Sequence, residues 1–348
     1  MGIRAKDFPI PSTYSRIIAR MLGLQERDLD RLLVGTGLPT EILLPGDDTH
    51  ISGDQQLRIL ENGRRIMGAP DFGLRLGRQL QPSSHGPLGY LALSSPDLMS
   101  SLQSLRDYQP VRLPLAAFAI DLDRDWLCCT LEIKVEATPD MSRIITEGFA
   151  LIIQSLVEAV LGRDAQEAVI QFEYPEPSYV DHYGEYLHAP YCFDCPKSTY
   201  RIPVELAYST NSSGDTESYR VAQDLCNSLL AQTPAATRSM SDRVRTLLLA
   251  QPRVSVTEDE VARALFVSKR TLVRRLAREN STYREIKAQV VSDLARRCLL
   301  ESRQSMDSIA TLLGYYDAAA FRKAFRNRHG MAPGAYREQF RVMSGDRH

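Results

Sequence analysis

Apolar side chains repeat at helical spacing through the first hundred residues. They recur every three or four positions, as at Ile17, Ile18, Met21, Leu22, Leu29, Leu32 and Leu33. Ser52 is a good N-cap for a helix over residues 52–67, and residues 96–108 form another short amphipathic helix. This part of the chain is therefore predicted to be mainly helical.

The middle of the chain mixes alternating and helical patterns. Residues 115–137 predict two strands that form a hairpin around Asp121–Asp125. A long helix is predicted over residues 139–162, with a proline at its start and a glycine at its end. A further strand at 168–174 is followed by a stretch rich in Tyr and Pro that predicts short strands and loops. These elements predict an α+β domain.

Turn-forming residues then divide the chain. Asn211–Ser218 is rich in Ser, Asn and Gly, and one helix follows it before a short polar linker. We therefore predict a regulatory domain over 1–214, a linker helix and linker over 215–238, and an all-α domain over 239–348. The apolar face of the linker helix suits either its own domain or a partner chain in a dimer.

The C-terminal third contains two similar units, each with a short helix, a tight turn and a second helix. In the first unit Thr257 and Glu260 form a capping box, and Ser268 caps the second helix. In the second unit Gly314 ends the short helix and Asp317 caps the next. The predicted buried faces of the second helices comprise Leu272, Val273, Leu276 and Ala277 in one unit and Phe321, Ala324 and Phe325 in the other.

Basic side chains occupy the opposite faces of both second helices. They are Lys269, Arg270, Arg274, Arg275 and Arg278 in the first unit and Arg322, Lys323 and Arg326 in the second, where Ala318 and Ala319 stand near the helix start. Arginine can bind guanine O6 and N7 together, and basic groups on phosphates add affinity that is independent of sequence. The two faces predict binding to double-stranded DNA.

A predicted helix joins the two units and has its own capping box at Thr282 and Glu285. About 20 helical residues span ~30 Å. Half-sites on one face of B-DNA lie ~34 Å apart. A connector of this length is expected to set the two basic helices into successive major grooves.

The distribution of charge supports this division. The chain has 348 residues, 43% hydrophobic and 24% charged, which excludes a globally disordered, fibrous or disulfide-scaffold protein. Its net charge is only -1, yet residues 238–348 hold 22 Lys and Arg against 12 Asp and Glu. The remaining 237 residues are acidic. A polyanion is therefore expected to bind the C-terminal third.

The C-terminal segment resembles a known family. Residues 309–337, IATLLGYYDAAAFRKAFRNRHGMAPGAYR, closely resemble the AraC-type transcription regulator motif, and VARALFVSKRTLVRRL resembles its first helix-turn-helix. The resemblance implies that Arg270 and Arg274 read bases, with Ala318, Ala319 and Lys323 at the equivalent places in the second unit. The neighbouring basic residues, Lys269, Arg275, Arg278, Arg322 and Arg326, are expected to bind phosphate.

Residues 85–111, and more weakly 15–205, are similar to the arabinose-binding-type sensor domain of one AraC subgroup. The resemblance implies control by a small-molecule effector, a homodimer and contact with RNA polymerase, as in an activator of transcription. His85, Tyr108 and Trp126 are the candidate pocket residues. The family label does not identify the ligand.

Three groups of residues are weak candidates for other chemistry. His182, His188, Cys192 and Cys195 have compressed spacing for zinc, and Asp121, Asp123 and Asp125 lack the glycine and final glutamate of a calcium loop. Cys128–Cys129 is a weak redox candidate. Since G-x-S-x-G, Walker A and H-E-x-x-H are absent from the sequence, we expect no metal, no cofactor and no enzyme activity.

The six cysteines form no regular framework, and the N-terminus lacks a signal-peptide pattern. No uninterrupted apolar run approaches ~18 residues, so a cytoplasmic protein without a membrane span is expected. Two other functions stay open. One is a ligand-free regulator whose N-terminal domain only dimerises, and the other is an enzyme fused to a DNA-targeting module.

Overall fold

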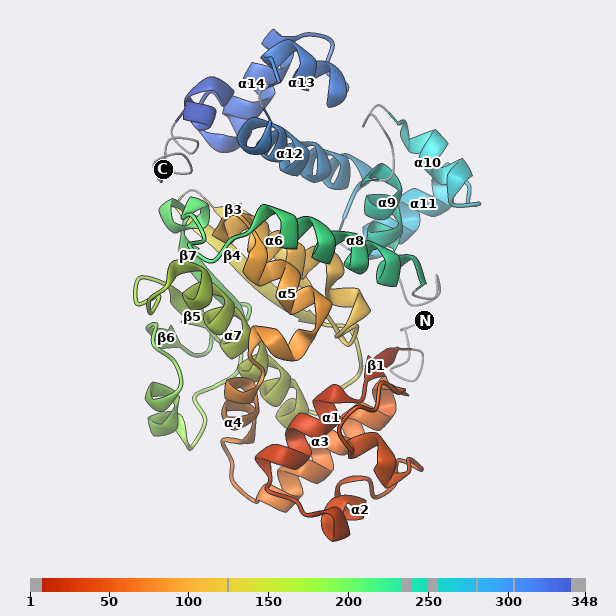
Figure 1. The fold of residues 1–348 in the computed structure, drawn as a ribbon, viewed down its shortest axis with the longest axis vertical. Coiled ribbons are helices and arrows are strands. Elements are labelled where there is room, and N and C mark those ends of the chain that lie inside the picture. The colour runs from red at the N-terminus through yellow and green to blue at the C-terminus, as the bar shows by residue number, and fades with distance from the viewer. Residues whose placement is uncertain are drawn as a thin grey trace. The chain divides into compact units, whose positions relative to one another are not determined.

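The structure is a computed structural model that describes residues 8–123, 125–232, 240–249, 256–279, 281–302 and 304–338. It divides into two compact units, Met1–Thr233 and Pro234–His348, each described by itself (Figure 1). The predicted linker lies mostly outside the described residues. The predicted boundaries stay predictions, although α8 (Thr216–Gln232) packs against α5 (Pro87–Ser94) of the first unit.

The first unit begins with a helical layer. It comprises α1 (Thr13–Met21), α2 (Leu29–Leu32), α3 (Gly53–Met67) and α4 (Phe72–Gln79), with a small antiparallel sheet of β1 (Pro9–Pro11) and β2 (His50–Ser52). The predicted cap at Ser52 is confirmed, because its side chain accepts from the Gln55 backbone N–H and Gln55 reaches back. These helices share one hydrophobic core.

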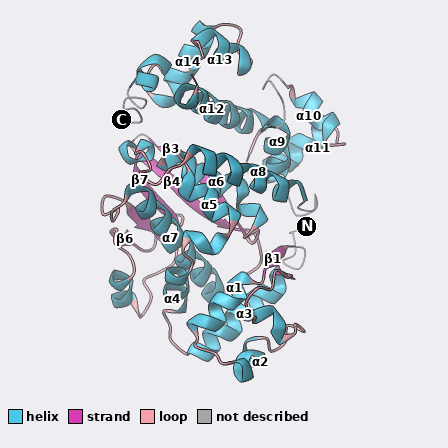
Figure 2. Cartoon of the chain, viewed as in Figure 1, coloured by secondary structure: helices cyan, strands magenta, loops and turns pink. Residues whose placement is uncertain are grey.

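A five-stranded sheet forms the second layer (Figure 2). Its order is β3 (Ala116–Asp123), β4 (Trp126–Ile133), β7 (Thr199–Pro203), β5 (Val169–Gln171) and β6 (Tyr191–Cys192). All neighbours are antiparallel except β5 and β6, which are parallel. The predicted hairpin is confirmed, since Asp123 lies opposite Trp126. This mixture of sheet and helices is the predicted α+β fold.

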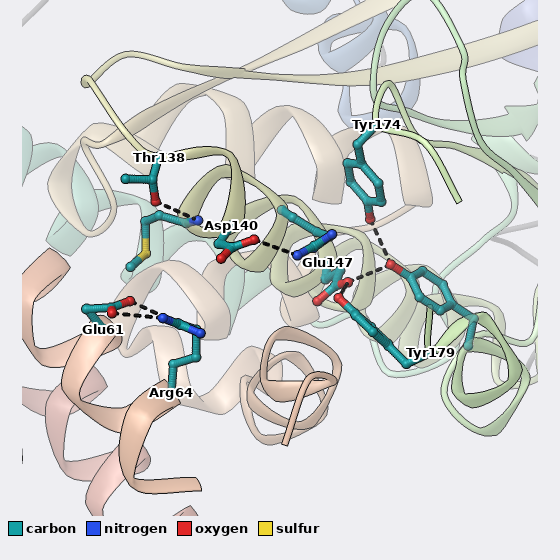
Figure 3. Close-up of polar contacts among 10 residues, drawn as sticks. Glu61, Arg64, Thr138, Asp140, Glu147, Tyr174 and Tyr179 are labelled. Atoms are coloured by element: carbon teal, nitrogen blue, oxygen red, sulfur yellow. Dashed lines mark hydrogen bonds and ion pairs between the residues drawn. The ribbon is translucent and has the colours of Figure 1, made fainter. Parts of the chain in front are cut away.

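Helix α7 (Pro139–Leu161) belongs to both hydrophobic cores of the first unit. The Thr138 side chain caps its start, as Figure 3 shows, and Gly162 ends it at φ 70°. By length and composition alone, helix α7 could cross a membrane. The sequence analysis did not indicate this, because polar residues interrupt the apolar residues of the segment. In the structure 67% of its most apolar window is buried, as expected for a core helix.

Close packing of α4 on α7 depends on small residues. A Cβ on Gly73 would lie 2.9 Å from the Ile144 Cα, and one on Gly77 would lie 3.0 Å from the Gly148 Cα. Because these are backbone atoms that cannot turn away, a side chain at either point would push the two helices apart. The other helices of this unit are α5 (Pro87–Ser94) and α6 (Leu98–Tyr108), and its 3-10 turns are η2 (Glu26–Asp28), η3 (Thr40–Leu43), η4 (Pro82–His85), η5 (Gln109–Val111), η6 (Val180–Glu185) and η7 (Val204–Tyr208).

The described part of the second unit is helical throughout, as predicted. Its helices are α9 (Met240–Leu249), α10 (Glu258–Ala264), α11 (Lys269–Arg278), α12 (Tyr283–Glu301), α13 (Met306–Leu312) and α14 (Ala318–His329), and residues 333–338 are also helical. Side-chain caps at Thr257, Ser268, Thr282 and Asp317 are all present. Ser305 caps helix α13, since its side chain accepts from the Ser308 backbone N–H.

Candidate functional site

Helices α10 and α11 form the first helix-turn-helix. Val261, Ala262 and Leu265 of α10 are buried. Phe266 turns the chain at φ 55°, a left-handed conformation that is uncommon outside glycine, and its ring is 95% exposed. Ser268 then accepts a hydrogen bond from the Thr271 backbone N–H, 3.2 Å away. The turn and cap fix where α11 begins.

The basic face of α11 points outward. Lys269, Arg270, Arg274, Arg275 and Arg278 are all exposed. Within the part of the chain that the structure describes, the four arginines form no ion pair. Lys269 does, since its Nζ lies 2.9 Å from Asp259 and 3.6 Å from Glu258, and the hydrogen bond to Asp259 raises the pKa of Lys269. The arginines are thus available to a polyanion.

The buried face of α11 is narrower than predicted. Leu272 and Leu276 are fully buried, but Val273 is 48% exposed and Ala277 is also exposed. The first helix-turn-helix is small, so only one apolar stripe of α11 is covered. Val273 and Ala277 therefore lie among the outward-facing basic residues.

Helices α13 and α14 form the second helix-turn-helix. Gly314 turns the chain at φ 78°, and the Asp317 carboxylate accepts from the Ala320 backbone N–H at 2.7 Å. Phe321 and Phe325 form the core with Tyr336. His329 stacks on Phe325, and its pKa is lowered to about 3, chiefly by burial and then by nearby arginines, so its ring is neutral.

Helix α14 also presents basic residues to solvent. Ala319, Arg322, Lys323 and Arg326 are exposed. Ala318 requires a correction, because it is only 5% exposed. Its methyl group packs into the unit at the first turn of α14 and so does not face a base edge. A buried and an exposed alanine next to each other could not be told apart by residue type.

The connector α12 contacts both helix-turn-helix units. Near its start, Lys287 donates to the Val256 carbonyl at 2.8 Å, next to α10. Further along, Ser292 Oγ lies 2.9 Å from His329 Nε2, and Arg328 donates to Gln289 Oε1 at 2.5 Å. These contacts hold α14 against the middle of α12. The predicted connector helix is confirmed, with 19 residues.

A separate cavity lies in the first unit, between its two hydrophobic cores. The space that no atom fills, including the mouth, is about 980 Å³. Helices α1, α3, α4 and α7 and strand β3 all contribute to its walls. Most of the lining is apolar, and its polar or charged members are Tyr14, Gln56, His85, Gln109 and Arg112.

One of the three predicted pocket residues lines this cavity. His85 is buried, and its Nδ1 lies 2.9 Å from the Tyr14 hydroxyl. Tyr108 instead donates to Asn227 Oδ1 of α8 at 2.7 Å, and Trp126 lies under the Arg201 guanidinium on the sheet. Sequence reasoning missed Arg112, because an isolated arginine after Pro110 gives no signal of facing a cavity.

The electrostatics of the cavity follow from burial. Desolvation, and then the positive charge of Arg112, lower the pKa of His85 to about 4, so its ring is neutral. Desolvation raises the pKa of Tyr14 to about 12 against the effect of Arg112. Arg112 is therefore the one formally charged group at neutral pH among the described residues that line the cavity.

The four residues that are candidates for zinc do not come together at one point. His182 contacts Asp71, His188 contacts Glu158 and Asp164, and Cys192 and Cys195 face each other with sulfurs 3.3 Å apart. The described residues do bring Glu158, Asp164 and His188 together at the surface. Burial raises the pKa of both Cys128 and Cys129, which makes their thiols less reactive.

An α+β unit with a cavity, followed in the sequence by two helix-turn-helix units with outward arginines, defines a DNA-binding transcription regulator. Comparison with known proteins agrees. Residues 27–209 match the arabinose-binding domain of AraC transcription regulator, N-term, and residues 261–339 match a helix-turn-helix domain. The chain belongs to the AraC family of transcription regulators.

Individual relatives are similar along most of their length. The chain is 31% identical to the Ornithine utilization regulator of Pseudomonas aeruginosa over 81% of this chain and 82% of that protein. It is 25% identical to the HTH-type transcriptional regulator VirS of Mycobacterium tuberculosis, over 84% and 85% of the two chains. A solved structure, the transcriptional regulator CdpR from Pseudomonas aeruginosa, aligns with a TM-score of 0.42 and 25% identity, covering 92% of this chain and 98% of that chain.

Proposed function

We propose that this regulator reads DNA with Arg270 and Arg274 of α11 and with Ala319 and Lys323 of α14, under the control of a small-molecule effector in the first unit. The observation that carries the proposal is the outward face of α11. Its arginines are exposed and form no ion pair with the residues that the structure describes. Free guanidinium groups on a capped helix suit bidentate contacts to guanine.

The remaining basic residues bind phosphate in this proposal. Arg275, Arg278, Arg322 and Arg326 are exposed beside the base-reading positions. Lys269 joins them after leaving Asp259, because an exposed ion pair of this kind is weak and is screened by water and salt. Helix α12 sets α11 and α14 into successive major grooves, since 19 residues at ~1.5 Å rise span about 28 Å.

The regulator acts as a homodimer that contacts RNA polymerase and activates transcription in the cytoplasm, by binding and not by catalysis. Support for the dimer comes from α8. Ala222 and Cys226 are buried against the first unit, whereas Val221 and Leu225 are about half exposed. The helix therefore packs on its own unit and still offers an apolar face to a second copy. The cavity favours effector control over a ligand-free regulator.

The test begins with DNA fragments selected by the purified full-length protein from a random pool. On the selected site Arg274→Ala should lower affinity by ~1–3 kcal/mol and relax the preference at one base position. Arg220→Ala is the matched control, because Arg220 is an exposed arginine on α8. If Arg274→Ala keeps the wild-type base preference, the base-reading role is wrong.

A further inference from the structure

Arg112 is a charged group in a mostly apolar cavity. It follows η5, and its Nε is buried and has no hydrogen-bond partner. None of the carboxylates in the described ranges lies within ion-pair distance of its guanidinium, and no Asp or Glu lines the cavity. The positive charge at this wall therefore has no counter-charge from the described chain.

The neighbours of Arg112 hold the guanidinium in place without neutralising it. Its Cζ lies 5.7 Å from the centre of the Tyr14 ring. On another side, a Cβ on Gly86 would lie 3.6 Å from the same atom. His85 beside it is neutral at physiological pH. The guanidinium is partly buried, and its Nε is left without a hydrogen-bond acceptor, so a complementary anion entering the cavity would gain free energy.

Helix α7 provides room in the cavity for an apolar body. Gly148 lies in the middle of α7 and is buried, yet a Cβ built on it would meet no atom within 4 Å. The missing side chain therefore faces open space in the cavity. Leu88, Phe118 and Ile152 are among the apolar residues around this space.

We propose that this cavity binds an organic carboxylate with an apolar body, whose carboxylate pairs with the Arg112 guanidinium and whose body lies along Gly148. The guanidinium fork matches a carboxylate in two parallel hydrogen bonds. A ligand with an ammonium group would find no acidic partner among the lining residues. The inference rests on the proposed function in that this carboxylate is the effector.

Arg112 also lies close to the last helix of the first unit. Burial raises the pKa of the Cys226 thiol on α8 to about 11, and the positive charge of Arg112 partly opposes this rise. One turn of chain before it, Tyr108 donates to Asn227 of the same helix. A carboxylate that neutralises Arg112 would therefore change the environment of α8 directly.

The test measures binding of decanoate to the full-length protein by calorimetry and by the shift in melting temperature. Decylamine and 1-decanol are the controls that keep the apolar chain and change the head group. Decanoate should bind and raise the melting temperature, decylamine should not bind, and 1-decanol should bind at least tenfold more weakly. Hexanoate and 4-phenylbutanoate complete the panel and vary the apolar body.

Two variants locate the site. Arg112→Met, which keeps the apolar stem, should weaken decanoate at least tenfold and leave 1-decanol nearly unchanged, whereas Arg112→Lys should keep part of the affinity. Gly148→Leu should abolish binding of all three carboxylates by filling the cavity. Arg201→Met is the matched control, because Arg201 lies over Trp126 outside the cavity, and it should bind decanoate as the wild type does.

The proposal is overturned if none of the three carboxylates binds below millimolar concentration, or if Arg112→Met and Gly148→Leu both bind as the wild type does. DNA binding is measured on the same preparations. If the protein binds its selected DNA but none of the carboxylates, only this inference is wrong. Carboxylate binding without any selected DNA site would remove the proposed function and leave the cavity assignment.

Discussion

Glu147 is a carboxyl group that the fold keeps away from water. It accepts hydrogen bonds from Tyr179 at 2.7 Å and Tyr183 at 2.5 Å, as Figure 3 shows for Tyr179, while its other oxygen is buried without a partner. Burial is the largest effect, and it raises the pKa of Glu147 from 4.5 to about 7 despite the tyrosines. The protonated form therefore suits the folded state better than the ionised form.

This gives a pH dependence with a definite sign. Because the folded-state pKa is raised, the contribution of Glu147 to stability is full below pH 4.5 and is lost as pH rises to about 7. Glu147→Gln should match the wild type near pH 4.5 and be more stable at pH 8 by up to roughly 3 kcal/mol. Urea unfolding at both pH values checks this, with Glu26→Gln, an exposed site, as control. Equal destabilisation at both pH values would contradict it.

Replacing a buried glycine with a larger residue usually destabilises a protein, but Gly148 should behave in the opposite way. A methyl group there meets open space, and alanine favours a helix interior over glycine by about 1 kcal/mol. Gly148→Ala should therefore raise the free energy of unfolding by about that amount. Gly77→Ala on the facing helix should lower it, because its Cβ would lie 2.7 Å from Leu151 Cδ1. Denaturant unfolding of the two variants should give opposite signs, and a loss in both would contradict the prediction.

Individual residues differ in how far sequence predicts them. The arginines of α11 were correctly expected on an outward face, because three of them repeat at helical spacing. Arg112, Gly148 and Glu147 gave no such signal, since their roles depend on which distant segments surround them. Ala318 was assigned to the wrong face because alanine is compatible with both burial and exposure.

At the scale of elements, helix ends were the most predictable feature. The caps at Ser52, Thr257, Ser268, Thr282 and Asp317 all form as the sequence indicates. A cap depends on hydrogen bonds between residues three positions apart, so local sequence contains the information. Sheet order and the parallel pair β5–β6 depend on contacts between distant segments, and the sequence pattern did not specify them.

The cap of α14 can be tested directly. Asp317→Ala removes the acceptor of the Ala320 N–H and should cost about 1 kcal/mol of stability, whereas Asp317→Asn should keep most of it. The free energy of unfolding, measured with denaturant, and the DNA affinity should fall together, because the first turn of α14 faces the proposed groove. Asp307→Ala in the neighbouring helix is the control, since no side-chain cap depends on Asp307. An unchanged Asp317→Ala protein would contradict this account of the cap.

At the scale of the whole molecule, the sequence already separated a basic third from an acidic remainder. It correctly indicated two helix-turn-helix units and an α+β unit, because periodicity and charge vary along the chain. It could not place the cavity, which is formed by residues from Tyr14 to Ile152. A site of that kind exists only after the two hydrophobic cores pack together.

Binding to DNA should depend steeply on salt. Lys269, Arg275, Arg278, Arg322 and Arg326 would give about five phosphate contacts for each protomer, and hence a slope of roughly −4.5 in log affinity against log salt. One protomer's contribution should fall about 500-fold between 50 and 200 mM salt. Equilibrium binding to the selected site and to unrelated DNA measures it. A flat response would contradict phosphate-dominated docking.

The ion pair at the start of α11 has a consequence for the search along a genome. Asp259 and Glu258, from the capped end of α10, hold Lys269 as a backbone oxyanion of a duplex would. In the proposed complex these two carboxylates would compete with phosphate for Lys269, and this competition would weaken binding to every sequence alike. The preference for the right site would then be left to the proposed base-reading arginines, and the time spent on unrelated sequences would be shorter.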